Sequence, residues 1–252
     1  MPAYNPCMES YQWNKGPLEY REEVAIKEMR IPLRNIMNEI GAEAEKGAYP
    51  LIIGDDASGR LPTLAMKRIL DSFCKEKGLP LPETRFVTGS KRLSPEELQA
   101  KKSKLAEFFD ETIDGELLSR LSAPGAKVLI MSDVVDTGTS LDPVIEELKA
   151  RNIGYQVVSL SLLYENRQPM LEKKWGEGNY TTGDVGLPYL FGMQTISGVK
   201  KQPEELFSTP FKDPRYSEEE KTEIQRQINA ARQMTDEVAD GVYKEWREKE
   251  GK

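Results

Sequence analysis

Short apolar runs that alternate with helix-like segments constrain the fold of this chain more than any other feature. The clearest unit begins with the apolar run 128–131, continues through a turn of small and hydroxyl-bearing residues, and ends in a helix-like segment, Asp142–Asn152. Similar runs at Leu51–Ile53, Thr84–Thr88 and Tyr155–Tyr164 are also separated by helical patterns. This alternation predicts an α/β fold, in which helices flank a twisted parallel sheet and ligands bind beyond the carboxyl ends of the strands.

Helical extensions are expected at both ends of the chain. Residues 18–46 have a loose apolar face, which Pro32 should kink or divide because proline cannot donate a helical hydrogen bond. Near the C-terminus, Ser217 and Glu220 have the spacing of a capping box and should start a long helix with an apolar stripe. We therefore expect three parts, namely an N-terminal arm and helix (1–47), a central domain (48–200) and a C-terminal linker and helix (201–252).

Two internal segments are less regular. Residues 89–121 are charged and helix-prone, and Ser94 with Glu97 marks the start of a helix there. Residues 165–216 contain many Gly and Pro residues, and within them only Gln194–Val199 suggests a short strand.

Composition narrows the possible functions. The chain of 252 residues has a net charge of −7, which argues against a general nucleic-acid surface and against an anionic membrane surface. No apolar run is long enough to span a membrane, and the N-terminus lacks the pattern of a secretory signal. The two cysteines, Cys7 and Cys74, have no metal or redox spacing. These features together predict a cytoplasmic protein.

The sequence contains no histidine. Catalysis by Ser-His-Asp or Cys-His groups is therefore excluded, as is zinc bound by histidine. Acid–base chemistry would have to use carboxylates, Lys, Tyr or the substrate itself.

The segment Val128–Leu141 reads VLIMSDVVDTGTSL and carries most of the chemical information. A turn of this kind before a helix offers backbone N–H groups and hydroxyls to an anion, and the helix N-terminus adds positive potential. The acids beside the turn suit sugar hydroxyls or a divalent cation. The combination predicts a sugar-phosphate ligand.

Two families share letters with this segment. It resembles the motif with which type I phosphoribosyltransferases bind phosphoribosyl pyrophosphate (PRPP), namely an apolar strand, two acids, two apolar residues and a Thr-Gly-x-Thr-like loop. The pentapeptide Asp136–Ser140 also matches the catalytic loop of pepsin-like aspartic proteases. A protease needs two facing carboxylates that share a proton, whereas the chain has one such loop and strand–helix alternation. The sequence therefore favours the phosphoribosyltransferase interpretation and keeps the protease as a minor alternative.

The resemblance assigns roles to the residues of the motif. Asp133 would accept hydrogen bonds from the ribose hydroxyls and contact Mg²⁺, and Asp136 would lie near the base as a general base, which favours a purine-like ring. The 5′-phosphate would be held by Thr137, Gly138, Thr139 and Ser140. The first acid of the family's pair is missing, because Ser132 stands in its place. This departure supports the main alternative, a non-catalytic module that senses PRPP or a nucleotide.

A second loop follows the first expected strand, where the family binds pyrophosphate. Its small residues allow backbone amides to approach phosphate, and its arginine supplies a guanidinium; the loop comprises Asp56, Ala57, Ser58, Gly59 and Arg60. Asp55 and Asp56 would repel pyrophosphate unless a Mg²⁺ lay between them, and Asp56 is an expected metal ligand. One PRPP molecule can contact both loops only if they lie within about 15 Å of each other. This is a short distance, because even an extended chain spans about 3.3 Å per residue.

Further basic residues follow the second expected strand. Lys91 and Arg92 are candidates for binding the leaving pyrophosphate, whereas Lys101, Lys102 and Lys104 are expected to form a solvated helix face. Tyr189 and Phe191 are candidates for stacking on the base, although core packing explains them equally well.

The sequence thus predicts a phosphoribosyltransferase-like protein that binds PRPP and transfers phosphoribosyl to or from a nitrogenous base with pyrophosphate exchange. Mg²⁺ is the expected cofactor. The expected partners are PRPP and a nucleobase or nucleotide, without nucleic acid or membrane, in a homodimer.

Overall fold

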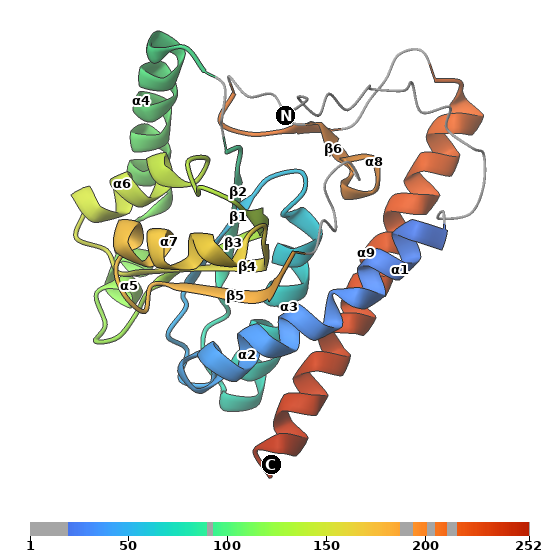
Figure 1. Cartoon of the computed structure of the whole chain (residues 1–252), viewed down its shortest axis with the longest axis horizontal. Helices are drawn as coiled ribbons and strands as arrows, with labels where there is room; N and C mark the ends of the chain where they lie inside the picture. The colour runs from blue at the N-terminus through green and yellow to red at the C-terminus, as the bar shows by residue number, and fades with distance from the viewer. Residues whose placement is uncertain (1–19, 90–92, 187–193, 201–204, 211–215, 252) are drawn as a thin grey trace.

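The fold is built on a five-stranded parallel sheet (Figure 1). The computed structural model of the chain describes residues 20–89, 93–186, 194–200, 205–210 and 216–251. The strands are β1 (Leu51–Asp55), β2 (Glu83–Val87), β3 (Val128–Val135), β4 (Tyr155–Leu162) and β5 (Tyr180–Val185). They are arranged in the order β2-β1-β3-β4-β5, and every neighbouring pair is parallel.

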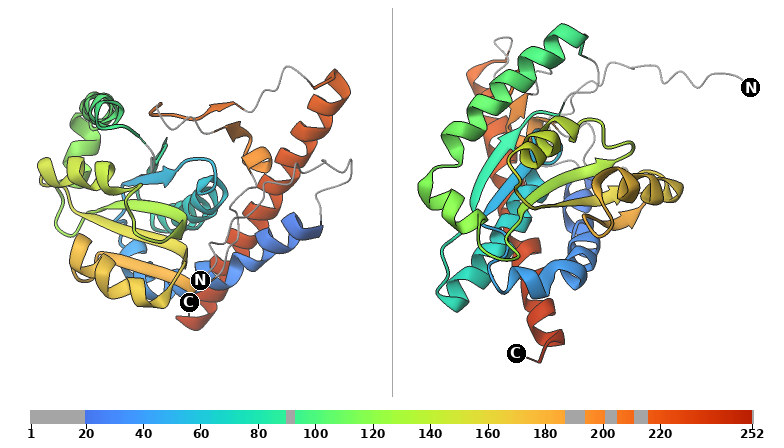
Figure 2. Two further views of the ribbon diagram at one scale, coloured as in Figure 1. Left: turned by 45° about the horizontal axis from the view of Figure 1, so that its top comes forward. Right: turned by 90° about the vertical axis from the view of Figure 1, so that its left-hand side faces the viewer.

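Helices cover both faces of this sheet, as the sequence predicted (Figure 2). One face carries α1 (Tyr20–Glu28), α2 (Arg30–Ala44), α3 (Arg60–Lys77) and α9 (Glu218–Lys249). The other face carries α4 (Pro95–Thr112), α5 (Gly115–Leu121), α6 (Asp142–Ala150) and α7 (Gln168–Trp175). The α/β class and the helical extensions at both ends are confirmed.

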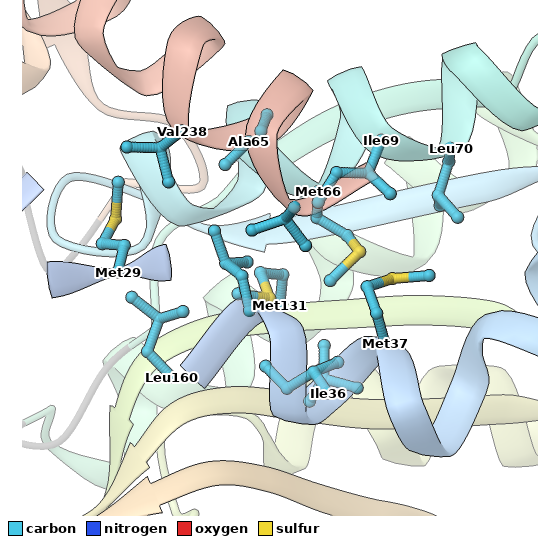
Figure 3. Packing of buried hydrophobic residues seen from close by; sticks show 14 of the residues in the cluster. Met29, Ile36, Met37, Ala65, Met66, Ile69, Leu70, Met131, Leu160 and Val238 are labelled. Atoms are coloured by element: carbon cyan, nitrogen blue, oxygen red, sulfur yellow. The ribbon is translucent and has the colours of Figure 1, made fainter. Parts of the chain in front are cut away.

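Alternate residues of the strands supply the two halves of the core. Ile52, Leu129 and Met131 face the side of α2, α3 and α9, whereas Ile53 and Ile130 face the side of α4 to α6. Figure 3 shows the first half, where methionine and isoleucine side chains from the helices pack onto the strands. Both halves are apolar, so strands buried on two faces read as continuous hydrophobic runs.

The strand order creates a switch point between β1 and β3. The loop after β1 leads to α3 on one face, whereas the loop after β3 leads to α6 on the other face. Because these two adjacent strands send their connections in opposite directions, this is the place where α/β sheets usually bind ligands in a crevice at the carboxyl ends of the strands. The word crevice denotes here the region between the loops that follow β1 and β3.

The N-terminal helical segment is divided as expected, with α1 and α2 meeting at Met29 three residues before Pro32. The C-terminal helix α9 begins with the expected capping box of Ser217 and Glu220. Its apolar stripe packs on α1, α2 and α3, and all three expected parts of the chain contribute to one apolar cluster. The part boundaries at residues 47 and 200 stay predictions. None of the helices in the described part of the chain is long and apolar enough to cross a bilayer.

Two features of β3 and the following chain differ from the sequence-based expectation. Strand β3 continues four residues beyond Met131, because β4 runs beside it and pairs up to Val135 with Leu162. Asp133 is therefore a strand residue and not a loop residue. The segment after β4 contains α7 and the edge strand β5, whose sequence YTTGDV is too polar to stand out as a strand.

The expected short strand at Gln194–Val199 is wrong for most of its length. Residues Gln194–Ser197 form a helical turn, α8, and only Val199–Lys200 forms a strand, β6, which pairs with β7 (Thr209–Pro210). The β-branched Ile196 is buried in the cluster that includes α9, so tertiary packing outweighs its local preference for a strand. A short 3-10 helix, η1 (Glu165–Arg167), connects β4 to α7.

Candidate functional site

The loop after β1 has the backbone of a tight binding turn. Ala57 has φ +70°, a left-handed conformation that residues with a β-carbon seldom adopt. Gly59 lies so close to β1 that an added β-carbon would be 2.3 Å from the carbonyl oxygen of Asp55. The loop then enters α3 at Arg60, and the backbone N–H groups of Ser58 and Gly59 donate no hydrogen bond to another described residue. These amides at a helix N-terminus suit an anion.

Asp56 organises this loop from inside. Its side chain is 1% exposed and accepts hydrogen bonds from the Ala57 N–H at 2.8 Å, the Arg60 Nε at 2.9 Å and the Ser208 N–H at 3.2 Å. Arg60 also lies over the ring of Phe86, with its Cζ 4.3 Å from the ring centroid. The expected metal ligand Asp56 and the expected pyrophosphate ligand Arg60 are thus paired with each other.

Asp133 joins the β1 loop to the β3 motif. The Ser58 hydroxyl donates to its Oδ1 at 3.0 Å, so the loop after β1 is in direct contact with the end of β3, three residues before Asp136. The residue is 3% exposed, and its Oδ2 is buried without a hydrogen-bond partner. Burial, followed by the charge of Asp55, raises the pKa of Asp133 to about 6, against lowering by nearby backbone N–H groups and Ser58. Oδ2 is therefore the atom of Asp133 that remains available to a ligand group.

The loop after β3 presents its polar groups outward. Gly138 has φ +68°, and an added β-carbon would be 2.1 Å from Cζ2 of Trp175. The hydroxyls of Thr137 and Thr139 lie 3.0 Å apart, Thr139 is exposed, and Thr137 is partly exposed. Within the described part of the chain, the backbone N–H groups of Thr139 and Ser140 donate no hydrogen bond. Hydroxyls and amides together can therefore reach a phosphate at the start of α6.

Asp136, the residue before Thr137, lies beside Arg167, a cation that was not expected at the site from the sequence. Its Oδ1 lies 3.3 Å from Nε of Arg167, at the end of η1. The pair is close enough for charge attraction, but neither atom has a well-directed hydrogen bond. Asp136 is half-buried, so part of its side chain remains accessible to a ligand.

The end of β2 contributes a third approach to the same crevice. The Gly89 N–H donates to Oδ1 of Asp55 at 3.0 Å, and an added β-carbon at Gly89 would be 2.8 Å from Cβ of Ser140. The loops after β1, β2 and β3 therefore converge. Lys91 and Arg92, the candidates for pyrophosphate binding, lie outside the described residues, as do Tyr189 and Phe191.

The expectation of a solvated basic face on α4 is wrong for Lys101. Its side chain is buried, and its Nζ donates to the Thr88 hydroxyl at 2.6 Å, at the end of β2. The spacing to Leu105 and Phe109, four and eight residues later, could have placed it on the inner face of the helix. Lys102 and Lys104 form ion pairs with Glu146 and Glu205.

A segment from the C-terminal part also reaches the crevice. Residues 205–208 run beside the end of β2, where Thr88 donates its N–H to the Leu206 carbonyl oxygen at 2.9 Å. Ser208 reaches Asp56 as described above. No local pattern announces these contacts, because they join residues more than 100 positions apart in the sequence.

The described residues contain no group of three or more Cys, Asp or Glu side chains arranged to hold a metal ion. A cation at this crevice would therefore need oxygen atoms from a ligand or from water, as is usual for Mg²⁺.

Comparisons with known proteins give only distant likenesses. No protein-family model matches the sequence, and no curated protein matches it either. Solved structures similar to this chain include a Staphylococcus aureus hypoxanthine phosphoribosyltransferase, with 19% identity, coverage of 65% of this chain and 73% of that chain, and a TM-score of 0.32. A Trypanosoma cruzi hypoxanthine phosphoribosyltransferase gives 19% identity, coverage of 70% and 80%, and a TM-score of 0.32. Values this low do not establish a shared function, so the geometry of the site has to carry the argument.

Proposed function

We propose that this chain binds PRPP in the crevice between β1 and β3 and transfers its phosphoribosyl group to or from a nitrogenous base. The contact between Ser58 and Asp133 carries the proposal, because it joins the loop expected to bind pyrophosphate to the strand residue expected to bind the ribose. The crevice also lies at the switch point of the sheet, where the fold itself favours ligand binding.

In this proposal each loop holds a different part of PRPP. The amides of Thr139 and Ser140, with the hydroxyls of Thr137 and Thr139, hold the 5′-phosphate at the N-terminus of α6. The Oδ2 of Asp133 accepts a hydrogen bond from a ribose hydroxyl and thereby gains its missing partner. The amides of Ser58 and Gly59 approach the pyrophosphate.

The catalytic contribution is mostly positioning and electrostatics. As pyrophosphate leaves, positive charge develops on the ribose and negative charge on the leaving group. Asp136 accepts a proton from the base, with a purine-like ring favoured, and Arg167 holds the carboxylate in place. A bound Mg²⁺ would neutralise the pyrophosphate charge, and the buried carboxylate of Asp133 fits such a cation.

The test is pyrophosphate release by the full chain with PRPP, Mg²⁺ and a panel of purine and pyrimidine bases. Asp136→Asn should lower the rate by about 10²- to 10⁴-fold, the usual contribution of a general base, and leave PRPP affinity nearly unchanged. Asp110→Asn, which removes an exposed carboxylate of α4 that pairs with Arg151, is the matched control and should keep the full rate. An unchanged rate in Asp136→Asn would remove its catalytic role.

A second candidate is a sensor that binds PRPP or a nucleotide without turnover. The ion pair between Asp136 and Arg167 favours it, because the carboxylate already faces a guanidinium of the chain itself. The serine at position 132 favours it too. A sensor would bind PRPP in calorimetry yet release no pyrophosphate with any base. Absence of PRPP and nucleotide binding at millimolar concentration would end both proposals.

The protease alternative finds no support in this geometry. An aspartic protease needs a second carboxylate that faces the first, whereas the group beside Asp136 is the guanidinium of Arg167. The loop also lies between a parallel strand and a helix.

The homodimer remains part of the proposal, and light scattering of the purified chain tests it. The apolar stripe of α9 is used within the chain, so a dimer would need another surface.

A further inference from the structure

Helix α7 packs against the loop that is proposed to hold the 5′-phosphate, although α7 lies outside the β3 motif. The ring of Trp175 covers Gly138, where an added β-carbon would lie 2.1 Å from Cζ2 of the ring. The Nζ of Lys174 donates to the carbonyl oxygen of Thr137 at 3.0 Å. Two consecutive residues of α7 thus contact two consecutive residues of the loop.

The same two residues of α7 also engage Asp142, the first residue of α6. The Nζ of Lys174 lies 2.6 Å from Oδ2 of Asp142, and the Nε1 of Trp175 donates to Oδ1 at 3.3 Å. Each oxygen of this carboxylate therefore has a partner on α7.

Trp175 is itself held by the sheet. Its carbonyl oxygen accepts hydrogen bonds from the Tyr155 hydroxyl at 2.5 Å and from Nδ2 of Asn179 at 3.0 Å. Its ring lies edge-on to the ring of Tyr180, with 5.4 Å between the ring centroids, and the residue is almost fully buried. The end of α7 is therefore a fixed support for the loop after β3.

The position of Asp142 creates an electrostatic conflict at a phosphate site. The backbone N–H groups of Thr139 and Ser140 attract an anion, as does the N-terminus of α6. A carboxylate at the first position of the same helix repels a phosphate dianion. The attraction can prevail only if the charge of Asp142 is balanced, and the ammonium group of Lys174 balances it.

We infer that Lys174 is a positioning residue of the phosphate site, which neutralises Asp142 and, with Trp175, holds its carboxylate at α7 so that the loop after β3 accepts a phosphate monoester. The inference rests on the proposed function and adds to it a helix that the motif does not include. Lys174 acts through Asp142 and needs no contact of its own with the phosphate.

The experiment measures the binding of ribose 5-phosphate, a phosphate monoester, to the full chain by calorimetry. Lys174→Met should bind it about tenfold more weakly, because the charge of Asp142 then repels the dianion without compensation. Lys174→Arg should bind nearly as tightly as the unmodified chain, because a guanidinium also pairs with a carboxylate. Lys173→Met is the matched control, since it removes the preceding, exposed lysine of the same helix, and it should bind normally.

A second substitution distinguishes charge compensation from a merely structural role of Lys174. The double variant Lys174→Met/Asp142→Asn has no carboxylate at this position and keeps an oxygen for the Trp175 N–H. It should regain most of the affinity for ribose 5-phosphate that Lys174→Met loses. Pyrophosphate, which is assigned to the loop after β1, should bind equally well to all these variants.

Three results would overturn the inference. The first is a double variant that binds ribose 5-phosphate as weakly as Lys174→Met does. The second is a loss of pyrophosphate affinity in Lys174→Met as large as its loss for ribose 5-phosphate. The third is an unmodified chain that does not bind ribose 5-phosphate.

Turnover assays separate this inference from the proposed function. If ribose 5-phosphate binding depends on Lys174 as expected but PRPP gives no turnover with any base, the inference stands and the proposed transfer fails. If the chain turns over PRPP but Lys174→Met keeps full affinity for ribose 5-phosphate, the proposed function stands and the inference fails.

Discussion

At the scale of single residues, the buried carboxyl of Asp133 links the free energy of unfolding to pH. Its pKa is raised from 3.8 to about 6, so the folded protein binds a proton more tightly than the unfolded chain. The stability that comes from this protonation is fully present below pH 3.8 and is lost as the pH rises through 6. Above that pH the folded state has to keep a charge away from water.

Replacing this carboxyl should therefore change the pH profile in a defined direction. Asp133→Asn should lose the fall in the free energy of unfolding between pH 4 and 7, a fall on the order of 3 kcal/mol at 1.36 kcal/mol per pKa unit. Urea unfolding of both proteins with a chelator present measures it. Parallel curves across this pH range would show that the carboxyl titrates as it does in water.

The motif residues could be identified from the sequence, but the burial and the contacts of their side chains could not. Asp133 and Thr137 were found from their order in the chain, and the structure places both at the crevice. The contact of Arg167 with Asp136 and the burial of Lys101 were not expected, because each depends on a neighbour on another element. Their local sequence looks the same whether that neighbour is present or absent.

At the scale of elements, the unit from β3 through the loop to α6 depends on a glycine for two separate reasons. Gly138 has a left-handed backbone, and its Cα faces the ring of Trp175 on α7. The first reason could be predicted from the Thr-Gly-Thr turn, whereas the second depends on a helix that the sequence did not reveal. The loop geometry is therefore set partly by packing from outside the motif.

Gly138→Ala should accordingly destabilise the fold by about 2–4 kcal/mol, which combines about 1 kcal/mol of backbone strain with 1–3 kcal/mol of overpacking. Gly78→Ala is a matched control, because Gly78 has a similar φ of +65° but no atom within 4 Å of an added β-carbon. It should lose only the strain, about 1 kcal/mol. Denaturant unfolding of both variants isolates the contact with Trp175, and equal losses would mean that the tryptophan simply moves aside.

At the scale of the whole molecule, the α/β class could be predicted, but the arrangement of its parts could not. The positions of the first four strands and of the terminal helices follow from local apolar patterns. By contrast, β5 lies against α2 through a close approach in which a β-carbon on Gly183 would be 2.4 Å from the carbonyl oxygen of Pro32. Contacts such as this one, or that of Ser208 with Asp56, join distant parts of the chain and have no local pattern.

The docking of α9 shows how the C-terminal extension stabilises the whole chain. Trp246 is buried between α2 and α3. Its ring lies edge-on to the ring of Phe73, with 4.9 Å between the two ring centroids, and a β-carbon added at Gly41 would clash with the Trp246 ring. Trp246→Ala should lower the free energy of unfolding by about 3–5 kcal/mol, whereas Lys244→Ala, on the exposed side of the same helix, should change it by less than about 0.5 kcal/mol. Thermal and urea unfolding check both values. Because α9 packs on the face that also supports β1 and α3, we expect Trp246→Ala to weaken PRPP binding at temperatures where the fold begins to unfold. If Trp246→Ala has the same free energy of unfolding as the unmodified chain, α9 does not contribute to the stability of the core.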